Sequence, residues 1–414
     1  MKVLYLSVNY SMFLACLTLP FSFRVSTFFL IAFAFLSLTY SLSLGGLKQN
    51  RKYFSFIKLP SIIFFIPLFG VFFTNYPKET FDLLIKYLPY FILSIAYFYA
   101  DPKIKKGISN FIRLGIIYGV LAVTIYLFTN LFFVFFKTNE SSSEILFSYK
   151  YTYRNFTAPL DTHTTYLGLL IIMSNHFVLY SKYKSIFKFL LLIFNLLSLL
   201  FIASKIILFI YVLQIIFLIF VIPSRLTKLV IVALLSVFSV VLVWQYQNNL
   251  DNIYFLQRIT REIVWDINPN NKGTSVNGKV KDDSRLVRWK AIIETSKGNL
   301  LLGYGSGSES TVLKEIHEKN NLVESLRRNY NSHNQYLFYL LENGILGLII
   351  FLYFLWTNLI KAILRRDLGI SLFVCSLIVI CFVENYLNRT MGVLAISIFL
   401  TFLKDNYEKN NPDF

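Results

Sequence analysis

The run Phe189–Pro223 reads FLLLIFNLLSLLFIASKIILFIYVLQIIFLIFVIP and contains a single charged residue, Lys205. About 20 predominantly apolar residues cross the hydrocarbon core of a bilayer as a helix. The run is therefore too long for one span and predicts two, which meet at Ala203-Ser204-Lys205. Small and charged residues at that point are typical of a turn at the outer membrane surface.

The same composition extends over the whole chain. Of its 414 residues, 56% are hydrophobic, 18% are aromatic and only 15% are charged. An ordinary soluble domain carries nearer a quarter charged residues, and a disordered chain has few aromatic residues. The sequence therefore predicts an all-α, polytopic membrane helix bundle of about 12 transmembrane helices. The approximate spans are 4–21, 25–46, 57–74, 82–100, 108–136, 163–181, 186–202, 205–223, 228–246, 335–360, 368–384 and 390–404.

The net charge of +18 would suggest nucleic acid in a soluble protein. In a membrane protein, Lys and Arg in short loops fix the orientation instead. Basic loops alternate along the chain so that they fall on one side if the N-terminus is cytoplasmic, and no nucleic-acid partner is expected. The predicted organisation is nine transmembrane helices in 1–246, a large, mainly helical periplasmic loop in 247–334, three more helices in 335–404 and a cytoplasmic tail in 405–414.

His333 is the histidine most suited to catalysis, because it stands where the long loop re-enters the membrane, in Asn331-Ser332-His333-Asn334. An imidazole titrates near neutral pH and can accept a proton there. The alternative is an interfacial histidine that hydrogen-bonds neighbouring amides. Position alone leaves both interpretations open.

Arg285 and Arg288 are three residues apart in an expected helix, so they share one face. Two guanidinium groups on one face are able to chelate a diphosphate. The alternative is a solvated basic face. Two interpretations are open for Lys205 as well. Its ammonium either snorkels to the interface or binds an anion inside the bundle.

Other polar residues gather at the expected outer ends of the spans. Glu384 and Arg389 flank the last outer turn and are expected either to pair or to line the same cavity. His163 begins a span and is expected either to cap the helix or to line that cavity, as Asn334 would. No carboxylate spacing typical of metal ligands occurs in the long loop, so neither a metal nor a cofactor is expected.

Three sequence features together resemble the O-antigen ligase family of bacterial envelopes, which includes related polymerases. They are Ser284-Arg285-x-x-Arg288-Trp289, the glycines of Gly303-x-Gly305-x-Gly307, and Ser332-His333-Asn334-Gln335-Tyr336-Leu337. The similarity is densest over 283–389. The resemblance implies a metal-independent glycosyltransferase in the bacterial inner membrane with a periplasmic active site.

In that family the donor is a glycan on undecaprenyl diphosphate, and a ligase transfers it to a lipid A-core sugar. Residue by residue, the resemblance implies that His333 is the essential histidine and Arg285 the loop arginine. Lys205 falls where the family usually has an arginine, and lysine lacks bidentate geometry. With Arg288 and Arg389, Lys205 is expected to hold the diphosphate while His333 activates the acceptor hydroxyl.

Two alternatives to a ligase remain. A polymerase shares the donor and the catalytic logic and differs in its acceptor. A flippase for lipid-linked glycans would instead need a charged path through the midplane and helix breaks in corresponding halves, and these are sparse in the sequence. The gathering of titratable residues at the outer ends of the spans favours a surface enzyme.

Overall fold

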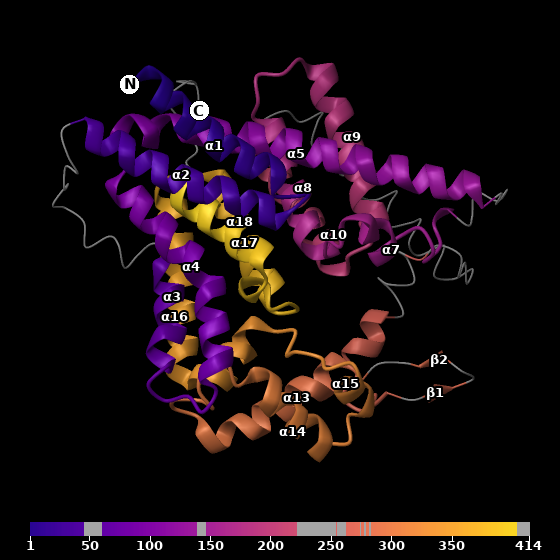
Figure 1. Cartoon of the computed structure of the whole chain (residues 1–414). Helices are drawn as coiled ribbons and strands as arrows, with labels where there is room; N and C mark the ends of the chain where they lie inside the picture. Colours follow the sequence, from indigo (N-terminus) through magenta and orange to yellow (C-terminus); the bar gives the residue numbers. More distant parts are fainter. Residues whose placement is uncertain are drawn as a thin grey trace. The chain divides into compact units, whose positions relative to one another are not determined.

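The computed structural model describes residues 1–44, 60–138, 146–221, 254, 262–273, 275–276, 279–280 and 283–403 (Figure 1). These residues are almost entirely helical. The two short strands, β1 (Ser275–Val276) and β2 (Lys279–Val280), pair antiparallel. The chain divides into two compact units, of which the first comprises 1–116 with 266–414 and the second 117–265. The all-helical fold class is therefore confirmed.

The first unit contains most of the helices. From the N-terminal half come α1 (Lys2–Thr18), α2 (Phe23–Ser43), α3 (Ser61–Gly70), α4 (Pro77–Tyr99) and the start of α5 (Pro102–Lys137). From the C-terminal half come α13 (Arg285–Ser296), η3 (Lys297–Asn299), α14 (Glu309–Lys319), α15 (Val323–Arg327), α16 (Gln335–Leu364), α17 (Leu368–Cys381), η4 (Tyr386–Asn388) and α18 (Thr390–Phe402).

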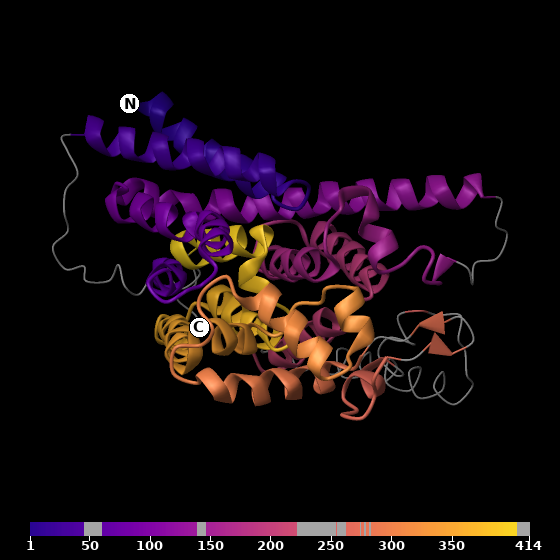
Figure 2. The ribbon, with the colours of Figure 1, turned by 60° about the horizontal axis from the view of Figure 1, so that its bottom comes forward.

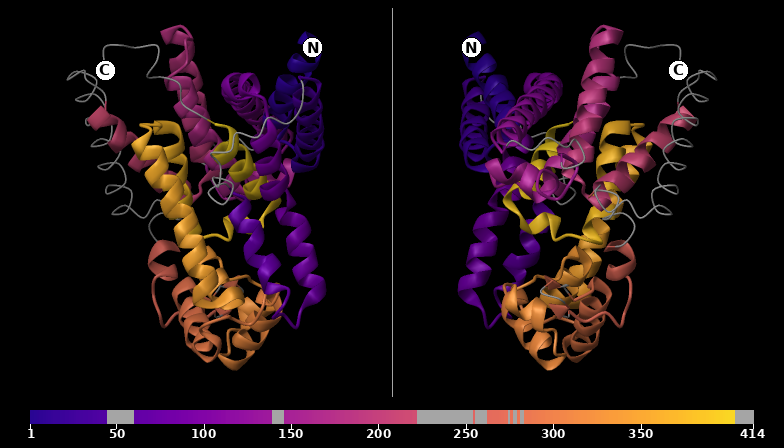
Figure 3. Two further views of the ribbon diagram at one scale, coloured as in Figure 1. Left: turned by 90° about the vertical axis from the view of Figure 1, so that its left-hand side faces the viewer. Right: turned by 90° about the vertical axis from the view of Figure 1, so that its right-hand side faces the viewer.

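Apolar helices pack against one another within this unit. Helices α1 and α2 lie side by side (Figure 2), and α4 contacts both α3 and α18. Helix α16 contacts α3 and α17, so the two halves of the chain interleave (Figure 3). The core positions are buried aromatic and aliphatic side chains such as Phe33, Tyr90, Phe373 and Phe399.

Helix α16 is two helices joined at Gly344, whose backbone is not helical (φ 63°, ψ −161°). The rings of Tyr336 and Tyr339 lie 5.4 and 4.7 Å from that of Phe351. In a continuous helix, residues 336 and 351 would be separated by about 22 Å. The chain therefore reverses at Gly344, and 335–343 packs back along 345–364. The single predicted span 335–360 is thus a short helix followed by a longer one.

The glycine-rich segment before α14 fits against this reversal. Tyr304 and Gly305 donate backbone hydrogen bonds to the carbonyls of Leu341 and Glu342, both 2.9 Å long. A Cβ atom on Gly344 would lie 2.3 Å from the carbonyl oxygen of Leu301. Only glycine permits both the positive φ and so close an approach of two backbones.

A small apolar core joins the long loop to the first part of α16. Its residues come from α13, α14, the link to α15 and 335–343, and they are Val287, Ala291, Ile292, Val312, Leu313, Ile316, Leu322, Leu337 and Leu341. The apolar side chains of α14 are therefore part of a core. The helical segment that follows Gly307 breaks into α14 and α15 near Asn321, which adopts the left-handed conformation (φ 55°).

The second unit contains the rest of α5, then α7 (Arg154–Thr157), η2 (Ala158–Leu160), α8 (Thr164–Leu179), α9 (Ser185–Ile202) and α10 (Lys205–Val221). Helix α8 contacts both α9 and α10. Ala203 takes a left-handed conformation (φ 47°) at the end of α9. The predicted division of the long apolar run at Ala203-Ser204-Lys205 is where the structure separates α9 from α10.

Five helices in the described residues are long and apolar enough to cross a membrane, namely α2, α4, α5, α9 and α16. Shorter apolar helices of 10–17 residues lie at 61–70, 164–179, 205–217, 368–381 and 390–402, all within or close to predicted spans. The predicted span 228–246 lies outside the described residues. The count of about twelve spans and the periplasmic side of the long loop remain predictions.

Candidate functional site

His333 lies in a tight turn immediately before α16. Its backbone is left-handed (φ 45°), and its amide donates to Oδ1 of Asn331. Asn334 caps α16, since its Oδ1 accepts from the amides of Tyr336 and Leu337 at 3.0 and 3.1 Å. Asn334, predicted to line a cavity, thus supports the backbone of the turn.

The imidazole of His333 contacts the carboxylate of Glu384, with 3.1 Å between Nδ1 and Oε2. Glu384 follows the end of α17, 51 residues further along the chain. Burial lowers the pKa of His333, while the charge and hydrogen bond of Glu384 oppose that shift and the positive charges of Arg288 and Arg285 add to it. The net pKa is below the ordinary value, so the ring is neutral at pH 7.

The two arginines of α13 lower the pKa of the same imidazole through their positive charges. Ser284 caps this helix by accepting from the amide of Val287. Arg288 is buried, and its guanidinium lies 4.9 Å from the ring centre of Tyr330. That ring in turn is 5.6 Å from the ring of His333. Arg285 pairs with Asp266, with 3.8 Å between Nε and Oδ2.

Trp289, next to Arg288, ties α13 to the turn. Its indole nitrogen donates to the carbonyl oxygen of Ser332 at 2.9 Å. The sequence motif that carries Arg285, Arg288 and Trp289 therefore supplies two cations and an anchor for the residue before His333. This anchoring contact was not predicted, although the tryptophan was part of the quoted motif.

A second anchor comes from Glu309 at the start of α14 and Asn385 beside Glu384. Oε1 of Glu309 accepts from Ser332 N at 3.0 Å, Ser332 Oγ at 2.7 Å and Asn385 Nδ2 at 2.7 Å. Sequence reasoning missed Glu309. It is one of several acidic residues in the loop, and its spacing from His333 gives no signal.

Arg389 lies at the N-terminal end of α18 and is exposed. It is within electrostatic range of Lys86 on α4, a cation that sequence reasoning did not single out. Glu309 also lies within electrostatic range of Lys86. The hydroxyl of Tyr87 donates to Oδ1 of Asn388, which precedes Arg389, and this contact holds α4 against the turn between α17 and α18.

Two predicted site residues belong to the second unit. Lys205 begins α10, and its ammonium lies 3.4 Å from Oε2 of Glu262. His163 caps α8, where its Nδ1 accepts from the amide of Thr165 at 3.4 Å. The cap was one of the two interpretations open for His163.

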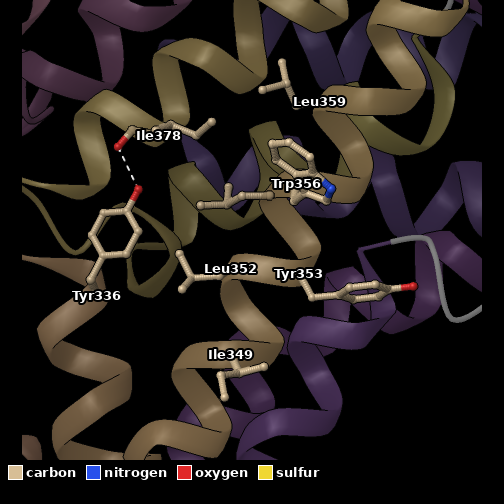
Figure 4. Close-up of a pocket in the computed structure, with 8 residues that line it drawn as sticks. Tyr336, Ile349, Leu352, Tyr353, Trp356, Leu359 and Ile378 are labelled. Carbon is tan, nitrogen blue, oxygen red and sulfur yellow. Dashed lines mark hydrogen bonds between the residues drawn. The ribbon is translucent and has the colours of Figure 1, made fainter.

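An apolar groove of about 480 Å³ runs along the two arms of α16 (Figure 4). Tyr336 stands on one side, with its hydroxyl donating to the carbonyl of Ile378 at 3.0 Å. The other lining residues share an apolar or aromatic character, and they are Ile349, Leu352, Tyr353, Leu355, Trp356, Leu359 and Ile378. One of its lining residues, Tyr336, thus follows His333 by three positions in the chain.

The first unit therefore brings His333 and Glu384, at the ends of the apolar helices α16 and α17, near Arg285 and Arg288 of the loop helix α13. Within the described residues, no three His, Cys, Asp or Glu side chains converge as metal ligands would. Such an arrangement defines a helical membrane protein with a titratable, cationic polar site.

Comparison with known protein families shows a match of residues 190–352 to O-antigen ligase. The matched region contains Arg285, Arg288 and His333, and the match supports the O-antigen ligase family that the sequence motifs indicate. No curated protein matches the chain. The family implies a glycosyltransferase-like enzyme whose substrates are a lipid-linked glycan and an acceptor in a membrane.

Proposed function

We propose that the protein transfers a glycan from undecaprenyl diphosphate to a hydroxyl of a lipid A-core sugar, at the periplasmic face of the bacterial inner membrane. The observation that carries this proposal is the contact between His333 and Glu384, 3.1 Å long, beside the cationic α13. A base oriented by a carboxylate and flanked by cations suits transfer from a diphosphate to a hydroxyl.

His333 acts as the general base. With Nδ1–H donating to Glu384, the lone pair on Nε2 is available to take the proton of the acceptor hydroxyl. The lowered pKa of His333 keeps this nitrogen unprotonated at neutral pH. The oxygen then attacks the anomeric carbon, the bond to the diphosphate oxygen breaks on the opposite face, and undecaprenyl diphosphate leaves with inversion. General base catalysis of this kind contributes roughly 10²–10⁴-fold.

The arginines stabilise the leaving group. Negative charge grows on the diphosphate as the anomeric bond breaks, and pre-placed cations lower the energy of that state most. Arg288 lies against Tyr330, whose ring contacts that of His333, and Arg285 precedes it by three residues on the same helix, so both are proposed as ligands of the diphosphate. Arg389 and Lys205 are proposed as further ligands of the donor, and Glu384, Asn334 and His163 as residues that line or support the cavity.

The groove beside α16 supports a lipid-linked donor. Its walls are apolar, and one of them carries Tyr336, close in the chain to the proposed base. A section of polyprenyl chain is proposed to lie along Leu352 and Trp356. A donor carried on a soluble nucleotide would have no use for such a groove.

The test is substitution of His333 by Ala and, separately, of Glu384 by Gln, assayed in membrane vesicles with purified lipid-linked glycan and lipid A-core. We expect the alanine variant to lose roughly 10²–10⁴-fold in transfer rate. Membrane insertion is checked by protein yield in the membrane fraction. Undiminished transfer by His333→Ala would exclude the histidine as base.

Deletion of the gene distinguishes the ligase from its alternatives. Loss of a ligase leaves complete long glycans on the lipid carrier. Loss of a polymerase leaves single repeat units, and loss of a flippase leaves carrier-linked units on the cytoplasmic side. We expect the first of these results.

A further inference from the structure

Glu309 and Asn385 form a hydrogen-bonded clamp around the turn that carries His333. Oε1 of Glu309 accepts the amide and the hydroxyl of Ser332, while the side-chain nitrogen of Asn385 donates to the same oxygen. On its other side, Oδ1 of Asn385 accepts from Asn334 N at 2.8 Å and lies 3.0 Å from Ser332 Oγ. The residues before and after His333 are thus both fixed.

This turn needs such support because His333 adopts a left-handed backbone (φ 45°). Non-glycine residues in that region carry a conformational cost and persist only where their surroundings hold them. Ser332, Asn385 and Asn334 are all buried. Four hydrogen bonds among these groups, three of which end on the Glu309 carboxylate, supply that constraint.

The clamp also joins three parts of the chain that are distant in sequence. Glu309 belongs to the long loop, Ser332 to the re-entry turn and Asn385 to the turn between α17 and α18. Asn385 directly follows Glu384, the residue that contacts the imidazole. The position of the His333 backbone and that of its carboxylate partner are therefore set by one network.

We infer that Glu309 and Asn385 are positioning residues that hold the His333 imidazole in register with Glu384. The inference rests on the proposed function only for its catalytic consequence, because the geometry of the imidazole can be measured without any sugar transfer. A displacement of about 1 Å in a catalytic group costs on the order of 10²-fold in rate.

The first measurement is the rate at which diethyl pyrocarbonate modifies His333 in the full-length, detergent-solubilised protein, followed by mass spectrometry of the peptide that contains it. We expect Glu309→Ala to raise this rate several-fold, since the released turn exposes the ring. Glu315→Ala removes the same charge from an exposed position on the same helix and should leave the rate unchanged. A modification rate in Glu309→Ala equal to that of the wild type would overturn the inference.

The second measurement separates positioning from general loss of structure. Glu309→Gln keeps an acceptor oxygen and should retain activity within about tenfold, whereas Glu309→Ala should lose about 10²-fold in kcat with little change in KM for the donor. Equal loss in both variants, or a loss confined to KM, would contradict a positioning role.

A paired substitution tests the contact itself. Asn385→Asp places a carboxylate against Glu309 and should free the His333 ring. The double variant Glu309→Gln/Asn385→Asp restores a donor and an acceptor with their positions exchanged, so it should return the modification rate toward that of the wild type. Failure of the double variant to improve on Asn385→Asp would show that the two side chains do not act together.

The two proposals fail separately. Should the modification rates follow this order while the wild type transfers no glycan, the clamp stands and the proposed function falls. If glycan transfer depends on His333 but not on Glu309, the proposed function stands and the clamp falls.

Discussion

At the scale of single residues, the groups around the imidazole of His333 shift its pKa in opposite directions. Burial and two arginines lower its pKa, and Glu384 raises it. Glu384 therefore has two effects that are separable by experiment: it orients the ring, and it makes the ring a stronger base than burial alone would allow.

The first prediction concerns pH. Activity of the wild type should persist below pH 6.5 and fall only as the pH drops through the lowered pKa of His333, because the neutral ring is the active form. Glu384→Gln removes the interaction that raises this pKa, so the acid limb of kcat/KM should move to lower pH while the maximal rate decreases. An acid limb that moves to higher pH would contradict the assigned contact.

The second prediction concerns Lys205, whose ammonium pairs with Glu262. If the cation binds a diphosphate, Lys205→Arg should keep activity and Lys205→Met should lose it, measured as KM for the donor and as transfer rate. The methionine variant retains the length and apolar stem of the side chain. Equal activity in all three forms would indicate a lysine that only reaches the interface.

The residue scale also shows where sequence reasoning ends. His333, Arg285 and Arg288 were identified because they stand in recognisable motifs. The sequence did not identify the partner of His333, because Glu384 was expected to pair with Arg389 or to line a cavity. A contact between residues 51 positions apart depends on how α16 and α17 pack, and no local pattern encodes it.

At the scale of elements, the reversal at Gly344 determines where the site lies. The helix 335–343 extends about 13 Å at 1.5 Å per residue, so the turn with His333 is displaced from Gly344 along the helix axis by about that length. The hydropathy of 335–360 is continuous, and a reversal within an apolar run leaves only a glycine as its signal.

The third prediction tests this reversal. Gly344→Ala should destabilise the protein by roughly 1–3 kcal/mol from the strained backbone alone. The steric contact of its Cβ with the carbonyl of Leu301, at 2.3 Å, adds to that cost. Activity should fall as well, since the helix that follows His333 must shift. The measurement is thermal unfolding in detergent together with transfer rate.

Gly298→Ala is the matched control. A Cβ at Gly298 approaches only the hydroxyl of Tyr304, at 3.7 Å, which is ordinary van der Waals contact. This variant should unfold and react as the wild type does. Similar behaviour of the two variants would mean that the backbone at Gly344 is not constrained as described.

At the scale of the whole molecule, the sequence predicts the helices well and their assembly poorly. Apolar segments bounded by polar breaks coincide with α2, α4, α9 and α18 to within a few residues, because the bilayer demands length and hydrophobicity at each span. The division into two units has no equivalent in the predicted organisation, since the packing of helices depends on contacts across the chain.

The fourth prediction concerns topology. Both termini should be cytoplasmic and the long loop periplasmic, because the basic loops alternate. A green fluorescent protein fused to the C-terminus should fluoresce, and alkaline phosphatase inserted after Gly273 should be active. Inactive phosphatase at that position would reverse the orientation and remove the proposed site from the periplasm.

The hydrogen bonds of Glu309 also limit how the protein can be recombined with its relatives. A chimaera that exchanges only 283–334 would bring a new loop to an unchanged turn between α17 and α18. Asn385 would then lose its contacts with Glu309 and Ser332 unless the new loop carried counterparts of both. Exchange of 283–334 together with 382–390 keeps Glu309 and Ser332 with their own partner, Asn385. Transplanting this loop without disturbing the turn that carries His333 is therefore a two-segment operation.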